Sequence, residues 1–281
     1  MKYPFADKAY FDFKAFKQAI HTQVRFLDNV LDASLWPLPE QHKESRNKRR
    51  IGVGFTGLAN ALAMCGEVYY KQGGLELANK IASTLRNEAY TASVELAKEK
   101  GAFPLFDADK YLEEGTFASR LPDSIKKQIR QHGIRNSHLL SVAPTGTVSL
   151  AFADNASNGI EPPFSLAYSR KKRTADGGHS FYNVLDHGFR VYLSTLVDQQ
   201  FAKELEDAVS NYKTTFTYKD VEYVVKDCLP EVLVTALSMS VEHHLAMMKT
   251  IQPYIDTSIS KCVAKGTPII TNKGILPVEE L

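Results

Sequence analysis

The stretch that most constrains the fold is residues 136–162, which read NSHLLSVAPTGTVSLAFADNASNGIEP. A short apolar run at 139–143 is bounded by turn-forming residues, and so short a run indicates a buried strand rather than a helix. A Pro-Thr-Gly-Thr turn follows at 144–147, and residues 148–152 are expected to open a helix. The sequence therefore predicts a strand, a turn and a helix N-terminus in direct succession.

This turn has the composition of an anion-binding site. Backbone N–H groups at a helix N-terminus, beside threonine hydroxyls, can bind phosphate or carboxylate, and Gly146 has no Cβ to keep an anion from the backbone. The candidate binding residues are Pro144, Thr145, Gly146, Thr147 and Val148. The alternative is a plain strand and turn in which a threonine caps the helix. The local sequence leaves both interpretations open.

Composition narrows the class of protein. A chain of 281 residues with 44% hydrophobic content can form one large or two modest globular domains. Its net charge of +2, from 34 basic and 32 acidic residues, is too balanced for a general nucleic-acid or membrane-surface binder. The first residues include no apolar h-region, and no apolar run is long enough for a membrane span, so we expect neither a signal peptide nor a membrane helix. We expect a cytoplasmic protein with no direct nucleic-acid or membrane binding.

Neither the cysteines nor the basic runs indicate a site by themselves. Cys65, Cys228 and Cys262 are too few and too scattered for a disulfide framework, and no Cys/His spacing indicates a metal site. The basic runs at 46–50 and 170–173 are predicted to be solvated faces, although the second follows the turn closely enough to line its mouth.

The rest of the chain alternates predicted strands and helices. We expect helices over 13–31 behind an Asp12 cap, 77–96 ended by Gly101, 122–132, much of 182–212, and 232–248, a strand at 164–168, and a surface excursion at 107–121. Connections long enough for crossover helices favour an α/β fold with largely parallel strands. The glycines of the formal G-x-G-x-x-G at 52–57 lack the flanking features of a dinucleotide site, and we expect them to let a helix pack closely against the sheet.

Three segments together carry a resemblance to a known family: QHGIRNS at 131–137, the P-T-G-T turn, and SNGIEP at 157–162. In this order they resemble the catalytic-barrel domain of ribonucleotide reductase large chains, from about Phe5 to Lys261. The P-T-G-T form resembles the adenosylcobalamin-dependent class, whereas the iron-dependent class usually has P-S-E-T-S here. The resemblance implies that residues 1–261 form the later part of a ten-stranded barrel, an incomplete domain, and that the turn holds the substrate phosphates.

The resemblance also implies an activity. The family reduces ribonucleoside di- or triphosphates to deoxyribonucleotides through a cysteine thiyl radical, here with adenosylcobalamin as cofactor and a thioredoxin-type reductant in the complete enzyme. The family's N-x-C-x-E strand is absent from the 281 residues, and neither Cys65 nor Cys228 matches a redox position. We therefore expect a fragment that is inactive alone and acts with the missing segments of the same reductase. The alternatives are an iron-dependent large chain and a catalytically inert nucleotide-binding remnant.

Residues 262–281, CVAKGTPIITNKGILPVEEL, depart from the family pattern and resemble the start of a Hint-type intein. Cys262 comes first, and a G-T-x-I-x-T segment, a turn and a second short strand follow. Splicing would begin when the Cys262 thiol attacks the carbonyl of Lys261 to give a thioester. The resemblance implies a truncated β-structured stub, either from a gene fragment or from one half of a split intein. The alternative is a β-hairpin that is native to the reductase domain.

Overall fold

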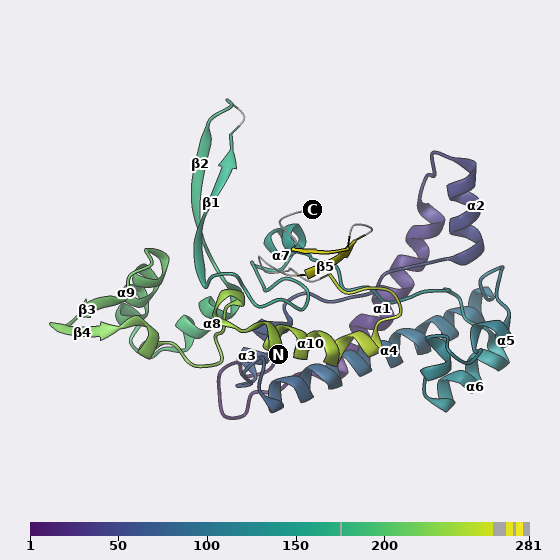
Figure 1. Cartoon of the computed structure of the whole chain (residues 1–281), viewed down its shortest axis with the longest axis horizontal. Coiled ribbons are helices and arrows are strands. Elements are labelled where there is room, and N and C mark those ends of the chain that lie inside the picture. The colour runs from purple at the N-terminus through teal and green to yellow at the C-terminus, as the bar shows by residue number, and fades with distance from the viewer. Residues whose placement is uncertain (175, 261–267, 272–273, 278–281) are drawn as a thin grey trace.

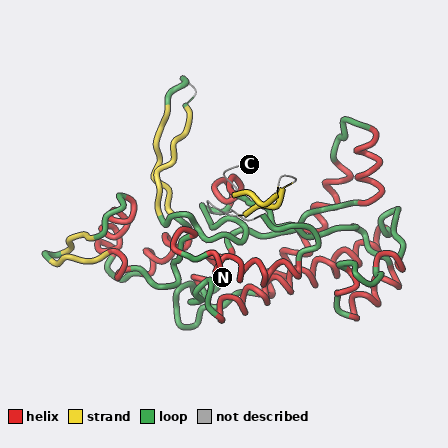
Figure 2. Tube along the Cα trace, in the orientation of Figure 1, coloured by secondary structure: helices red, strands yellow, loops and turns green. Residues whose placement is uncertain are grey.

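The computed structural model describes residues 1–174, 176–260, 268–271 and 274–277, the last two ranges by their backbone alone. The molecule is elongated, with helices along its length and paired strands projecting from it (Figures 1 and 2). The helices are α1 Phe13–Ala33, α2 Pro39–Lys48, α3 Leu58–Met64, α4 Gln72–Lys100, α5 Ala108–Tyr111, α6 Asp123–His132, α7 Gly146–Phe152, α8 His187–Thr195, α9 Gln199–Ser210 and α10 Val241–Ile251. The strands are β1 Ala167–Arg173, β2 His179–Leu185, β3 Thr215–Tyr218, β4 Val221–Val224, β5 Pro268–Thr271 and β6 Gly274–Pro277.

Helices α1 and α4 form the main scaffold, and both predicted helices are confirmed. The Asp12 carboxylate accepts a hydrogen bond from the Ala15 N–H at 3.0 Å, which caps α1. Gly101 ends α4 with a φ of +82°, a conformation that glycine adopts without steric cost. The apolar face of α1, with Ile20 and Val24 at its centre, is buried in the main hydrophobic core. Helix α6 also lies where it was predicted.

Three short parallel segments cross the centre of the molecule. Val53 pairs with Leu140, and Val142 pairs with Ile259, so the predicted strand at 139–143 lies between segments near 53 and 259. Each pairing is an isolated bridge. The first is supported by a hydrogen bond of 2.6 Å from the Val53 N–H to the Leu139 carbonyl, and the second by one of 3.1 Å from the Val142 N–H to the Ser258 carbonyl. Leu139, Leu140 and Val142 of this segment are buried, as expected, whereas Ala143 at its end is exposed.

The prediction of largely parallel strands is wrong for the strands of regular length. Within the described residues, β1 pairs with β2, β3 with β4 and β5 with β6, each as an antiparallel hairpin. Hairpin partners are neighbours in sequence, whereas each parallel pair is joined by a long excursion and shares only one bridge. The fold is mixed α/β, and its parallel part is confined to the centre.

The glycine motif has a different role from the one predicted. A Cβ placed on Gly54 would lie 2.2 Å from the backbone oxygen of Ser141, so Gly54 allows two chain segments, rather than a helix and a sheet, to approach each other. Gly57 has a φ of +79° and starts α3. These glycines bring residues 52–57 against the central segment.

The region after residue 164 differs most from the sequence predictions. The predicted strand at 164–168 begins later, as β1. The first residues of the predicted helix, 182–185, instead belong to β2, because residues 179–185 pair with β1 residue by residue. Helix α8 then starts behind Asp186, whose carboxylate accepts from the Phe189 N–H at 3.1 Å. A second, smaller core holds α8, α9 and β3 together through Leu166, Phe189, Leu193, Ala202, Leu205, Ala208, Phe216 and Val225.

Two further boundaries need correction. Residues 107–121 are not a surface excursion, because Leu112, Ala118 and Leu121 belong to the main core. Helix α10 starts at Val241, behind a Ser240 cap, and not near 232, since a short 3₁₀ turn occupies part of the earlier segment. Among the helices of the described residues, none has the length and apolar character to cross a bilayer.

Candidate functional site

The predicted turn leads directly into α7, and the N-cap residue of this helix, Thr145, is strained. Thr145 has φ +48° and ψ +19°, a left-handed conformation that costs a non-glycine residue about 1–3 kcal/mol. Its side chain makes no capping bond to α7. Because the first intrahelical bond runs from Ser149 N–H to Thr145 O, the N–H groups of Gly146, Thr147 and Val148 have no acceptor within the helix. The alternative of a capping threonine is therefore wrong.

The hydroxyl of Thr145 is used to hold the turn in place. It lies 2.8 Å from the Thr56 hydroxyl and accepts from the Gly159 N–H at 2.9 Å. Thr56 in turn donates to the carbonyl of Ser157 at 2.8 Å. Thr147, by contrast, is exposed, and its hydroxyl makes no hydrogen bond within the described part of the chain. The five predicted residues thus lie together, but the two threonines have different roles.

Sequence reasoning missed two side chains that shape this turn. Ser149 is 1% exposed, and its hydroxyl donates to the Asn158 Oδ1 at 2.8 Å, or to the Gly146 carbonyl at 3.0 Å. The first bond orients the carboxamide, so that Asn158 Nδ2 lies 3.8 Å from where a Cβ on Gly146 would be. No described group accepts a hydrogen bond from this Nδ2. The SNGIEP segment was the only sequence signal for Asn158.

A cavity of about 340 Å³ adjoins the turn, and we call it the turn cavity. Its lining residues are Gly146, Thr147, Ser149, Leu150, Asn155, Asn158, Tyr168 and Arg170. Arg170 comes from β1, which confirms that the second basic run reaches the mouth of the turn. Its guanidinium forms no ion pair with any carboxylate in the described ranges. The cavity therefore combines backbone donors with an uncompensated positive charge.

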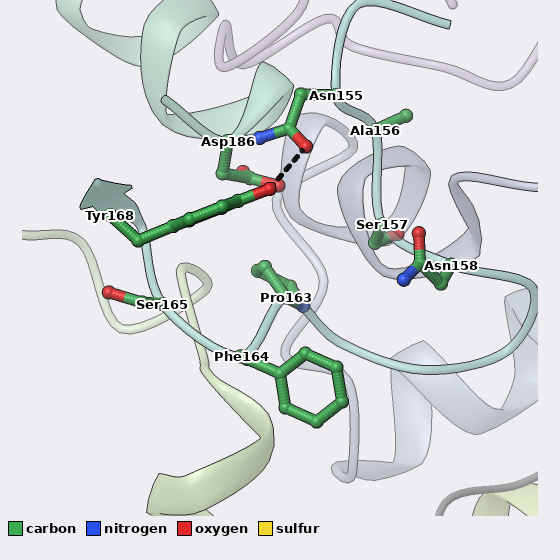
Figure 3. A pocket seen from close by; sticks show the side chains of 9 residues that line it. All are labelled: Asn155, Ala156, Ser157, Asn158, Pro163, Phe164, Ser165, Tyr168 and Asp186. Atoms are coloured by element: carbon green, nitrogen blue, oxygen red, sulfur yellow. Dashed lines mark hydrogen bonds between the residues drawn. The ribbon is translucent and has the colours of Figure 1, made fainter. Parts of the chain in front are cut away.

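A second cavity, of about 260 Å³, lies beside the first, and we call it the Tyr168 cavity (Figure 3). It is lined by Asn155, Ala156, Ser157, Asn158, Pro163, Phe164, Ser165, Tyr168 and Asp186. The Tyr168 hydroxyl donates to the Asn155 Oδ1 at 3.0 Å, and the Asn155 amide donates to the Leu185 carbonyl at 2.8 Å, so the ring is anchored. Burial raises the pKa of Asp186, although its carboxylate accepts a hydrogen bond from the Asn60 amide at 2.8 Å.

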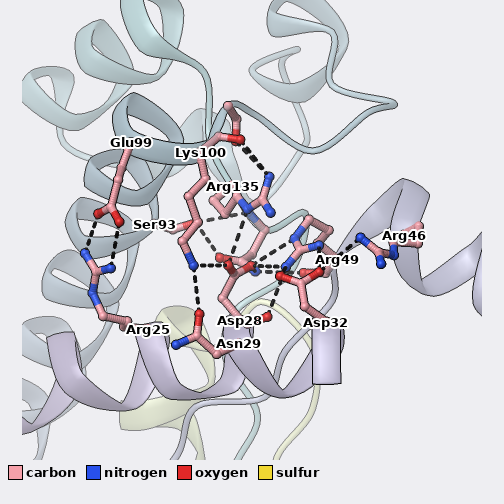
Figure 4. Close-up of polar contacts among 12 residues, drawn as sticks. Arg25, Asp28, Asn29, Asp32, Arg46, Arg49, Ser93, Glu99, Lys100 and Arg135 are labelled. Carbon is pink, nitrogen blue, oxygen red and sulfur yellow. Dashed lines mark hydrogen bonds and ion pairs between the residues drawn. The ribbon is translucent and has the colours of Figure 1, made fainter. Parts of the chain in front are cut away.

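At the opposite end of the central segment lies a buried ionic cluster (Figure 4). Asp28 is fully buried and accepts from Arg49 Nε at 2.9 Å and from Asn136 Nδ2 at 3.1 Å. Arg135 Nε adds a third donor at 3.3 Å. The prediction that the basic run at 46–50 is wholly a solvated face is wrong for Arg49, which is 2% exposed because this carboxylate pairs with it. The cluster fixes the point at which the chain enters the central segment.

Cys65 and Cys228, the cysteines of the described residues, do not line either cavity. The Cys65 and Cys228 thiols both have raised pKa values, mainly because they are partly buried, and a thiol of raised pKa is a poor nucleophile at neutral pH. Cys262, the predicted splicing nucleophile, lies outside the described residues.

Taken together, an uncapped helix start, a strained turn, an unpaired arginine and an adjoining aromatic cavity form an arrangement that can hold a phosphorylated ligand on a mixed α/β scaffold. The chain belongs to the ribonucleotide reductase barrel-domain family, whose profile matches residues 2–267. This agrees with the resemblance carried by the P-T-G-T turn and its flanking segments.

The similar proteins are large reductase chains. The chain is 30% identical over 256 residues to a vitamin B12-dependent ribonucleoside-diphosphate reductase of Mycobacterium tuberculosis, covering 90% of this chain and 32% of that protein. A protein of the same name from Thermoplasma acidophilum is 29% identical over 256 residues, covering 90% and 29%. A ribonucleoside-diphosphate reductase large chain of Encephalitozoon cuniculi is 29% identical over 182 residues, covering 61% and 23%. The chain thus spans about a third or less of the length of these relatives.

Proposed function

We propose that this chain is the part of a vitamin B12-dependent ribonucleoside-diphosphate reductase that binds the substrate phosphates. The complete enzyme would convert ribonucleotides to deoxyribonucleotides by radical chemistry. Relatives named as vitamin B12-dependent match 90% of the chain, whereas several relatives named only as large chains, large subunits or alpha subunits match 57–61%. This difference favours the adenosylcobalamin-dependent class over the iron-dependent alternative.

The observation that carries the proposal is the uncapped first turn of α7. Gly146, Thr147 and Val148 have N–H groups with no acceptor in the helix, and Gly146 and Thr147 line the same cavity as Arg170. Hydrogen bonds to a charged group contribute roughly 1.5–3 kcal/mol each. A ribonucleoside di- or triphosphate supplies such charged oxygens. In this proposal Pro144 and Thr145 shape the turn, and Gly146, Thr147 and Val148 donate to the phosphates.

The wider assembly is part of the same proposal. The three parallel segments at the centre would belong to the later part of the ten-stranded barrel, formed by residues 1–261, and this part would work with other segments of the same reductase. Adenosylcobalamin would supply the radical and a thioredoxin-type protein the electrons, in the cytoplasm. We assign no described residue to the cofactor.

The test is a matched pair of threonine variants in nucleotide binding. Thr147→Val removes a hydroxyl from the turn, and Thr217→Val removes an exposed one from β3, outside both cavities. We expect Thr147→Val to raise the Kd for a ribonucleoside diphosphate about tenfold, since one charge-assisted bond is lost, and Thr217→Val to leave it unchanged. Calorimetric titration of the purified chain measures both. Equal affinities in two folded variants would argue against the phosphate turn.

We infer a second function for residues 262–281, the start of an intein. The family profile ends at 267, only a few residues beyond Cys262, and the hairpin that follows, β5 with β6, pairs with no other described strand. In the first step the Cys262 thiol would attack the Lys261 carbonyl, which replaces the peptide bond by a thioester and frees the Cys262 amine. A downstream reductase segment would then be joined to Lys261.

Trans-splicing tests this second proposal. The chain is mixed with a complementing intein portion fused to a tagged reductase segment, and the ligated product is identified by mass spectrometry. We expect ligation at Lys261 with the natural sequence and none with Cys262→Ala. A Cys228→Ala variant is the control and should ligate normally. Ligation that persists in Cys262→Ala would refute the assignment.

A further inference from the structure

A separate cavity of about 210 Å³ lies at the entry of the central segment, and we call it the Asp256 cavity. It shares no lining residue with the turn cavity or the Tyr168 cavity. Its lining includes Tyr90, Lys110, Tyr111, Phe117, His138 and Asp256. Cavities that hold drug-sized ligands usually measure about 300–1,000 Å³, so this one suits a smaller molecule.

Asp256 contributes a negative charge that no described cation offsets. Its carboxylate accepts from the Leu139 and Leu140 N–H groups and from the Tyr90 hydroxyl, all of them neutral donors, and it forms no ion pair within the described residues. A carboxylate has about four acceptor positions, and Asp256 Oδ1 accepts only from Leu140, so it can accept one more hydrogen bond. Burial lowers the pKa of His138, so this neighbouring ring is uncharged at pH 7. A cationic donor is the group that would complete the carboxylate.

Lys110 brings a positive charge to the same cavity. Its side chain is 84% exposed, and the ion pair it forms among the described carboxylates is with Asp107 at 3.9 Å, too long for a hydrogen bond. Lys110 and Asp256 line one cavity and yet do not pair with each other. Because the lysine ammonium sits on a flexible four-carbon stem, it can follow the position of a ligand. The cavity therefore presents two opposite charges to one small space.

Aromatic rings form the apolar wall between these charges. Tyr90 is 1% exposed, and its ring stacks on that of Phe117 with the centroids 5.9 Å apart. The Tyr111 hydroxyl donates to the Ser137 carbonyl at 3.1 Å, which anchors the third ring. Rings that are already held in place lose little conformational freedom when a ligand binds. Their faces accept both apolar groups and ammonium groups.

We propose that the Asp256 cavity binds a small aliphatic α-amino acid. The ammonium of the ligand donates to Asp256 Oδ1, its carboxylate pairs with Lys110, and its side chain lies against the rings of Tyr111 and Phe117. A zwitterion matches this cavity because a ligand with a single charge would leave one of the two protein charges without a partner. The site lies outside the proposed phosphate turn and adds a second ligand to the chain.

The experiment divides the ligand into its two charges. The purified chain is titrated with valine, with isobutylamine, which lacks the carboxylate, and with isovalerate, which lacks the amine. Each Kd is measured by NMR titration. We expect each analogue to bind at least about tenfold more weakly than valine, since it loses one charge-assisted contact.

Two lysine variants test the positive charge. Lys110→Met removes the ammonium and keeps an unbranched side chain, and Lys43→Met is the matched control, because Lys43 is exposed on α2 and lies outside the cavity. We expect Lys110→Met to raise the Kd for valine about tenfold and to leave the Kd for isobutylamine unchanged. Lys43→Met should change neither value.

An Asp256→Asn variant tests the negative charge. It keeps one acceptor oxygen and removes the charge, so it should weaken the binding of valine and of isobutylamine alike. Circular dichroism shows whether this variant is folded, and the lysine variants decide the proposal if it is not, because Lys110 is exposed and outside the core.

Three results would overturn the proposal. Valine might bind no more tightly than isobutylamine, or with an unchanged Kd in Lys110→Met, and the amino-acid assignment would then be wrong. A folded Asp256→Asn variant that binds valine as tightly as the natural chain would remove the carboxylate from the site. If neither valine nor isobutylamine binds, the cavity holds no such ligand. The phosphate turn is tested with nucleotides and stands or falls separately.

Discussion

The two ends of the central segment, residues 139–143, use polar groups in opposite ways. At the entry, Asp28 and Asn136 are fully buried and hydrogen-bonded, and Asp256 accepts from the Leu139 and Leu140 N–H groups at 2.8 and 2.9 Å. At the exit, the first turn of α7 keeps three N–H groups without an intrahelical acceptor. Buried polar groups that are fully hydrogen-bonded stabilise the fold, whereas N–H groups without an acceptor are available to a ligand. The comparison assigns stability to the buried cluster at the entry and phosphate binding to the exit.

The largest expected effect is at the entry. Asp28→Ala removes the buried carboxylate that pairs with Arg49 and leaves this guanidinium only the partly exposed Asp32, and removing one member of a buried ion pair costs about 3–5 kcal/mol. Urea unfolding of the variant should show this loss in the free energy of unfolding. The control is Asp109→Ala, which breaks a 2.8 Å ion pair with Arg130 at the surface, where the Asp109 side chain is 90% exposed. Its loss should cost less than about 1 kcal/mol. Similar losses in both variants would remove the distinction between the buried cluster and the surface.

The next largest effect is a difference in stability between variants of the two threonines in the turn. Thr145→Val leaves the buried Gly159 N–H without its acceptor, which costs about 1–3 kcal/mol of stability. Thr147→Val removes an unbonded, exposed hydroxyl and should leave the free energy of unfolding unchanged. Thermal and urea unfolding of the two variants measure this difference. A destabilised Thr147→Val would show that this hydroxyl also serves the fold.

The smallest effect is a dependence on pH at the rim of the buried cluster. The hydrogen bond from Arg49 lowers the pKa of Asp32 below its unfolded value of about 4. The stabilisation is therefore present above the unfolded pKa and is lost as pH falls through the folded pKa. Asp32→Asn should be less stable than the natural chain at pH 7, and the difference should shrink at pH 3. Asp7→Asn, at an exposed residue outside any described ion pair, is the control. A difference that is equal at both pH values would contradict the assignment.

Local pattern was sufficient for the turn and for the long helices. The five turn residues are contiguous, so a strand followed by Pro, Gly and two threonines was enough to place them. Helices α1 and α4 were found for the same reason, since apolar spacing, Asp12 and Gly101 are local signals.

The local sequence pattern could not predict which charged residues are buried or which strands pair with each other. Arg49 sits in a basic run that resembles a solvated surface, and only the placement of α1 brings Asp28 to it. Arg170 and Tyr168 enter the site because the hairpin of β1 and β2 places them beside the turn, a tertiary arrangement. Residues 179–185 can form either a strand or a helix by composition, and pairing with β1 selects the strand.

The bonds from Asp256 also bear on how the chain folds as it is made. Asp256 lies 117 residues after Leu139, and the parallel partner at Ile259 follows it, so the central segment lacks these contacts until almost every helix has left the ribosome. Contacts this distant in sequence slow folding. The helical scaffold of α1 and α4 forms from earlier residues. Until residue 259 is made, the edge of the apolar central segment that pairs with it has no partner. A nascent chain that is stalled before residue 254 would therefore expose an unpaired, aggregation-prone strand edge. The segment that covers this edge in the finished fold lies immediately upstream of the proposed splice junction.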